Sequence, residues 1–101
     1  MQDRLAIGYT AEDLARIMDS GKTAVLLGLE GLDGLGTEPE WLHALYHMGF
    51  RHAMLTWSTD NAFAAGSAHE GPGDGLTDLG AEVLRLMERL GMLVDVSHAS
   101  E

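Results

Sequence analysis

The feature that most limits the fold of this sequence is an alternation of amphipathic helix and apolar strand, repeated three times. We expect helices over residues 11–20, 38–48 and 78–90, and strands over residues 23–30, 50–57 and 92–97. The strand segments are short and almost continuously apolar, which is typical of strands buried on both faces. Such an alternation predicts parallel strands joined by right-handed crossovers, and therefore an α/β fold.

Threonine and glycine mark the boundaries of the expected helices. A threonine hydroxyl can accept a hydrogen bond from a free backbone N–H, and a glycine readily ends a helix. The expected N-caps are Thr10, Thr37 and Thr77, and the expected stop residues are Gly21, Gly49 and Gly91. Residues 58–75 form a long, polar, glycine-rich connection, and loops of this length are usually functional or mobile.

Three parallel strands make a poor sheet by themselves, because both outer strands present unpaired apolar edges. Helices can cover the faces of the sheet but not these edges. We therefore expect either pairing with a second copy, as a homo-oligomer, or a segment of a closed barrel. The sequence also stops three residues after His98, which suggests part of something larger.

Composition excludes several classes of partner and site. The chain has 16 acidic and 6 basic residues and a formal charge of −10, so we expect binding neither to nucleic acid nor to an anionic membrane surface. Carboxylates do suit divalent cations. Cysteine is absent, which excludes disulfides and thiolate zinc sites. No secretory signal or long apolar span is visible, and we expect a cytoplasmic protein.

The carboxyl ends of the expected strands carry the residues of most chemical interest. Parallel α/β sheets bind ligands at this edge. The first strand delivers Glu30, the second Trp57, and the third Asp95 and His98. A carboxylate and an imidazole that converge there could form a metal or acid/base site. Alternatively, Glu30 is a solvated turn residue and His98 an inert terminal one, while Asp95 orients a neighbour by hydrogen bonding.

Other polar residues are weaker candidates. His43 and His47 are four apart on a helix, a spacing that can chelate metal, but we expect them on its solvent face. No role is assigned to His52 or His69, and Arg51 is expected to pair with an acid. The glycine-rich stretch GLEGLDGLG does not follow a phosphate-loop pattern, and its acids would repel an anion.

Two longer stretches carry a family resemblance that covers the chain from about Val25 to its end. They are LLGLEGLDGLGTEPEWLHALYHMGFRHAMLTWSTDNAFAAG and GLTDLGAEVLRLMERLGMLVDVSHAS. Together they resemble the membrane (renal) dipeptidase family of zinc metallopeptidases. The specific parts are the Glu-Gly after the first strand, GFRHAMLTW, and GLTDLG with MERLGMLVDVSH.

The resemblance implies a TIM-type (β/α)₈ barrel that hydrolyses dipeptides with two bridged zinc ions. By position, Glu30 looks like the carboxylate that bridges the metals, and His98 like the first of two histidines on one of them. Zinc ions would polarise the scissile carbonyl and lower the pKa of a bridging water. The chain would supply approximately barrel strands three to five, with no second domain.

The sequence also departs from the family pattern. The family's first-strand His-x-Asp pair and its last metal-binding histidine have no counterpart here. Where several members carry a histidine after Leu-Thr, this chain has Trp57, which can neither ligate zinc nor transfer a proton. Trp57 is then expected to form an apolar wall of the substrate pocket or to plug the barrel mouth.

Three functional hypotheses follow from these observations. The first is a dipeptidase segment, inactive by itself, that holds metal through Glu30 and His98. The second is a non-catalytic α/β fragment or interaction module stabilised by oligomerisation. The third is a related barrel hydrolase for another amide or a lactone.

Overall fold

The computed structural model describes residues 4–68 and 75–100. Within these ranges the elements follow in the order β1 (Leu5–Ile7), α1 (Ala11–Asp19), β2 (Thr23–Val25), β3 (Leu27–Glu30), the short 3₁₀ helix η2 (Asp33–Leu35), α2 (Trp41–His47), β4 (Phe50–Met54), α3 (Asp78–Leu90) and β5 (Leu93–Asp95). None of the helices in the described ranges is long and apolar enough to cross a membrane.

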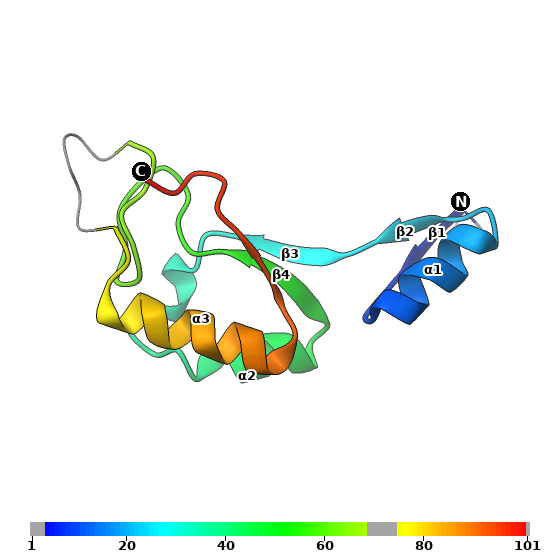
Figure 1. Ribbon diagram of the computed structural model, residues 1–101, viewed down its shortest axis with the longest axis horizontal. Coiled ribbons are helices and arrows are strands. Elements are labelled where there is room, and N and C mark those ends of the chain that lie inside the picture. Colours follow the sequence, from blue (N-terminus) through cyan, green and yellow to red (C-terminus); the bar gives the residue numbers. More distant parts are fainter. Residues whose placement is uncertain (1–3, 69–74, 101) are drawn as a thin grey trace.

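The strands form two sheets, and the strands within each sheet are parallel. β1 pairs with β2, and β3, β4 and β5 form a three-stranded sheet in that order. The apolar run 23–30 was expected as one strand, but Leu26 divides it into β2 and β3, which pair with different partners. Figure 1 shows β1, α1 and β2 at one end of an elongated molecule measuring 47 × 25 × 19 Å. β1 was not predicted from the sequence.

Two of the three expected helix caps are present. The Thr10 hydroxyl accepts from Asp13 N–H at 3.0 Å, and the Thr77 hydroxyl accepts from Gly80 N–H at 2.9 Å. The prediction for Thr37 was wrong, because α2 begins four residues later, with Glu40 at its N-cap and no side-chain cap bond. Successive i→i+3 hydrogen bonds hold the intervening chain in tight turns, from Glu38 N–H to Leu35 O and from Trp41 N–H to Glu38 O.

The hydrophobic core lies between the three-stranded sheet and the two helices that cover one of its faces. Figure 1 shows α2 and α3 on the same side of this sheet. Ala53 of β4 is fully buried against this layer, and Leu29 of β3 packs on it. The largest fully buried side chains are Phe63, Leu32, Leu42, Met87 and Val83. Because side chains alternate along a strand, the neighbours of Leu29 and Ala53 point to the opposite face.

Arg51 connects the two sheets. Its guanidinium donates to the carbonyls of Tyr9, Tyr46 and Phe50 at 3.0, 2.7 and 2.9 Å, and it lies 3.6 Å from the centre of the Tyr46 ring. We expected Arg51 to pair with an acid. Within the described part of the chain, its recorded partners are instead backbone carbonyls and tyrosine rings. Arg51 therefore ties the segment that follows β1 to the start of β4.

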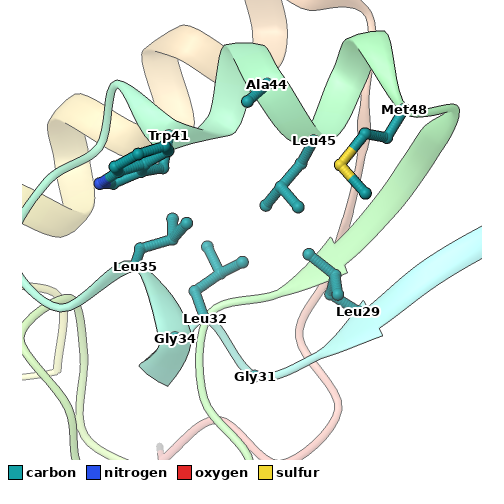
Figure 2. A pocket seen from close by; sticks show the side chains of 9 residues that line it. All are labelled: Leu29, Gly31, Leu32, Gly34, Leu35, Trp41, Ala44, Leu45 and Met48. Atoms are coloured by element: carbon teal, nitrogen blue, oxygen red, sulfur yellow. The ribbon is translucent and has the colours of Figure 1, made fainter.

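An apolar pocket of about 390 Å³ lies between α2 and the helix-covered face of β3 (Figure 2). Leu29, Leu45, Trp41 and Met48 all line it. Trp41 and Met48 were expected on the buried stripe of α2, but they are 61% and 67% exposed because they stand at the rim of this pocket. His43 and His47 lie on the exposed side of α2, as predicted.

We expect the isolated chain to self-associate. The outer edge of β5 has no strand partner among the described residues, and Leu93 and Val96 beside it are 58% and 75% exposed. Light scattering over a concentration series should show a rising mass, which Val96→Lys should reduce by charging the edge. A sharp monomer mass at high concentration would contradict this prediction.

Candidate functional site

Glu30 and His98 meet at the carboxyl edge of the three-stranded sheet. Glu30 is the last residue of β3, and His98 follows the end of β5 by three residues. His98 Nε2 lies 3.8 Å from Glu30 Oε1, and the side chains are 38% and 58% exposed. The two residues that the sequence singled out as metal donors are therefore brought together, although their strands are not neighbours.

The spacing of these two atoms suits a shared metal ion. Ligand distances to zinc are about 2.0–2.2 Å for imidazole nitrogen and carboxylate oxygen, so two donors on one tetrahedral ion lie about 3.4 Å apart. The observed 3.8 Å is too long for a hydrogen bond and close to that spacing. Two donors make only part of a zinc shell. No group of three or more potential ligands occurs among residues 4–68 and 75–100.

The backbone at His98 is held in an uncommon conformation. Its φ of 66° lies in the left-handed region, which costs a non-glycine residue about 1–3 kcal/mol. Neighbouring contacts fix this geometry: the Thr56 hydroxyl donates to His98 O at 3.2 Å, and Ser100 N–H donates to Ala65 O at 3.1 Å. Thr56 is itself buried. Thr56, two residues after β4, and Ala65 thus hold the backbone around His98 in place.

Trp57 stands beside the same site. Its ring centroid lies 6.1 Å from that of His98, with the two planes tilted by 54°. The indole is half exposed, and its backbone packs near Gly31, directly after Glu30. An apolar surface therefore borders the Glu30 and His98 donors on the β4 side.

Asp95 accepts hydrogen bonds from His52 and Ser97. Its Oδ2 lies 2.9 Å from His52 Nε2, and its Oδ1 accepts from Ser97 N–H at 2.8 Å. Hydrogen bonds from the Ser97 side chain, from His52 and from the Ser97 backbone lower the pKa of the Asp95 carboxyl well below its ordinary value. The carboxylate is therefore charged at neutral pH.

Two residues near this edge were not predicted from the sequence to have a role. His52 received no role, yet it is the side-chain partner of Asp95. Asn61 shapes the loop after Trp57: its amide donates to Leu55 O at 2.6 Å, and its Oδ1 accepts from the N–H groups of Phe63 and Ala64 at 2.9 and 3.2 Å. The sequence feature that could have identified His52 is its position as a polar residue inside a mostly apolar strand. Of the expected loop, residues 69–74, with His69, lie outside the described residues.

The opposite face of β3 offers no comparable chemistry. Leu29 precedes Glu30 and, by strand alternation, points to the other side of the sheet, into the pocket of Figure 2. That pocket is lined by apolar side chains and glycines. The candidate chemical site is therefore the strand-end cluster of Glu30, His98 and Trp57.

The whole chain, residues 1–101, matches the family model for membrane dipeptidase, peptidase family M19. The chain belongs to the membrane dipeptidase family. Among curated members, a dipeptidase of Claviceps purpurea (tcpJ) is 38% identical over 100 residues, which are 98% of this chain and 24% of that protein. An uncharacterised dipeptidase of Schizosaccharomyces pombe is 42% identical over 90 residues, 86% of this chain and 22% of that one. The chain spans about a quarter of the length of these relatives.

Solved structures of a metallopeptidase and an amidohydrolase contain the same fold. A metallopeptidase from Rhodobacter sphaeroides, solved with a phosphinate mimic of the dipeptide L-Ala-D-Ala, gives a TM-score of 0.89 at 25% identity, over 99% of this chain and 30% of its own. An amidohydrolase from Pseudomonas aeruginosa gives 0.87 at 21% identity, over 97% of this chain and 30% of its own. The predicted α/β class, a parallel-stranded segment of a TIM-type barrel, is confirmed.

Proposed function

We propose that this chain is a segment of a metal-dependent dipeptidase and supplies two zinc ligands, Glu30 and His98, to its active site. The observation that carries the proposal is the approach of His98 Nε2 to Glu30 Oε1, 3.8 Å apart at the carboxyl edge of a parallel sheet. Family membership supports it. The segment would supply approximately strands three to five of the barrel, and the other ligands would come from outside it.

The two donors fit this role chemically. A carboxylate has two oxygens and can bridge two ions, while a neutral imidazole offers one nitrogen to a single ion. Glu30 therefore suits the bridging position between two zinc ions, and His98 suits one of them. Zinc bound there would polarise the scissile carbonyl and lower the pKa of a water molecule. A dipeptide is the proposed substrate, supported by the dipeptide mimic held by the Rhodobacter sphaeroides enzyme.

Trp57 is the proposed apolar wall of the substrate pocket. Its half-exposed indole lies beside the His98 ring, where a substrate side chain could pack against it. An indole supplies a large, rigid contact surface but no metal ligand or proton for transfer at neutral pH. Trp57 would therefore influence which dipeptides bind, rather than the chemical step.

We expect the isolated chain to show no dipeptidase turnover, because the two donors brought together within residues 4–68 and 75–100 cannot hold two zinc ions. A coupled amino-acid assay with zinc present would measure release of alanine from L-Ala-D-Ala. Turnover that survives repurification and disappears in Glu30→Ala would contradict this expectation.

A segment exchange tests the proposed function itself. The matching backbone of the Rhodobacter sphaeroides metallopeptidase would be replaced by this chain, since the two superpose over 99% of it. We expect the folded chimera to hydrolyse a dipeptide in a zinc-dependent manner. A chimera that folds and binds zinc through its remaining ligands, but is no more active than one carrying both Glu30→Ala and His98→Ala, would refute the proposal.

A further inference from the structure

A second polar cluster lies one level below the strand-end site, on the same face of the sheet. Glu30, Met54 and Asp95 are register partners across β3, β4 and β5, and so are Gly28, His52 and Leu93 one level lower. The His52–Asp95 hydrogen bond therefore runs diagonally, from the lower level of β4 to the upper level of β5. The proposed function gives His52 no task.

Gly28 makes room for the His52 ring. A Cβ atom at Gly28 would lie 2.2 Å from His52 Nδ1 and 2.9 Å from its Cγ, far inside van der Waals contact. The backbone of Gly28 is not in the positive-φ region, so its conformation alone does not require glycine. The requirement comes from the imidazole that occupies the place of a side chain on β3.

Asp95 connects His52 to the turn that leads to His98. One carboxylate oxygen faces His52, and the other accepts from Ser97 N–H at 2.8 Å. This bond closes the turn by which the chain leaves β5 and reaches His98, whose φ is 66°. A carboxylate without a second partner could rotate about its Cβ–Cγ bond, which would take the accepting oxygen out of line with Ser97 N–H. The imidazole on Oδ2 keeps Oδ1 directed at Ser97.

We propose that His52 is a positioning residue: it fixes the Asp95 carboxylate, which holds the Ser97 turn and so keeps the His98 imidazole within reach of Glu30. Gly28 is glycine because any larger residue would displace His52. The inference deepens the proposed function and rests on it only where His98 is taken as a zinc ligand. The positioning of the turn can be tested without any metal.

The test compares His52→Leu, His52→Gln and Gly28→Ala in the full chain, with His43→Leu on the exposed face of α2 as the matched control. The first readout is amide hydrogen exchange at Ser97 by NMR. We expect His52→Leu and Gly28→Ala to speed this exchange about tenfold, the effect of one lost hydrogen bond to a charged group. His52→Gln keeps an N–H donor and should recover part of the protection, and His43→Leu should change nothing.

The second readout is the zinc dissociation constant by calorimetry, measured with His43 and His47 changed to alanine because that exposed pair could itself bind zinc. We expect His52→Leu to raise it about tenfold, as for other groups that orient a metal ligand. Unchanged Ser97 exchange in both His52→Leu and Gly28→Ala would overturn the proposal. If either variant unfolds, His52→Phe, which keeps a ring at this position but has no N–H donor, gives the same exchange test. Faster Ser97 exchange in a chain that binds no zinc would support the positioning role while contradicting the proposed function.

Discussion

Replacing Glu30 by glutamine in the segment-exchanged dipeptidase is expected to lower kcat/KM for dipeptide hydrolysis by about a thousandfold or more. Glutamine keeps the size and shape of the side chain but removes the negative charge and one of the two oxygens. A neutral amide cannot bridge two cations, so the metal pair would lose its shared ligand. The measurement is initial rate against substrate concentration, with zinc content determined for each preparation.

A nearby acid provides the matched control for this substitution. Asp33 lies on η2, three residues after Glu30, and is exposed. Asp33→Asn removes the same amount of charge from the same region without touching the donor pair, and we expect it to leave kcat/KM largely unchanged. Equal losses in Glu30→Gln and Asp33→Asn would mean that general electrostatics, rather than ligation by Glu30, accounts for the effect.

The largest effect on stability is expected for Gly80→Ala in α3, which should lower the free energy of unfolding by about 3 kcal/mol. In an ordinary helix interior this exchange is stabilising by about 1 kcal/mol. Here the added Cβ would lie 2.0 Å from the carbonyl oxygen of Phe63. That carbonyl accepts from Thr77 N–H and from the Thr77 hydroxyl at 2.9 and 3.0 Å. It cannot move away without breaking the contacts that anchor the start of α3.

Urea denaturation followed by circular dichroism would measure this loss. Gly34→Ala is the matched control, because a Cβ at Gly34 meets no atom within 4 Å and its backbone is not in the positive-φ region. We expect its unfolding midpoint to stay near that of the unsubstituted chain. A Gly80→Ala chain as stable as the Gly34→Ala chain would show that the loop around Phe63 can relax.

The sequence correctly predicted features that depend on residues close together in the chain. Thr10 and Thr77 cap their helices because the bonded N–H lies three residues away in each case. Thr37 was predicted to be an N-cap for the same reason, and this prediction was wrong. Turns closed by hydrogen bonds to the Leu35 and Glu38 carbonyls precede α2, which begins only at Trp41. By local propensity alone, the glycine at position 80 would only weaken its helix. Its true constraint comes from Phe63, which is distant in sequence.

In the candidate site, too, some contacts could be predicted from the sequence and others could not. Parallel strands bring their carboxyl ends to one edge, so the proximity of Glu30 and His98 was predictable from element order. The His52–Asp95 bond was not, since it depends on register and on the space left by Gly28. β1 was missed because Leu5–Ile7 is too short to show a strand period and is stabilised by pairing with β2.

The most direct test of the central claim is a calorimetric zinc titration of this chain. His43 and His47 should first be changed to alanine, because an exposed histidine pair four residues apart on a helix can bind zinc by itself. In that background we predict one zinc site that is lost in both Glu30→Ala and His98→Ala. Zinc binding that is the same with and without these two substitutions would contradict the account and leave this segment as scaffold.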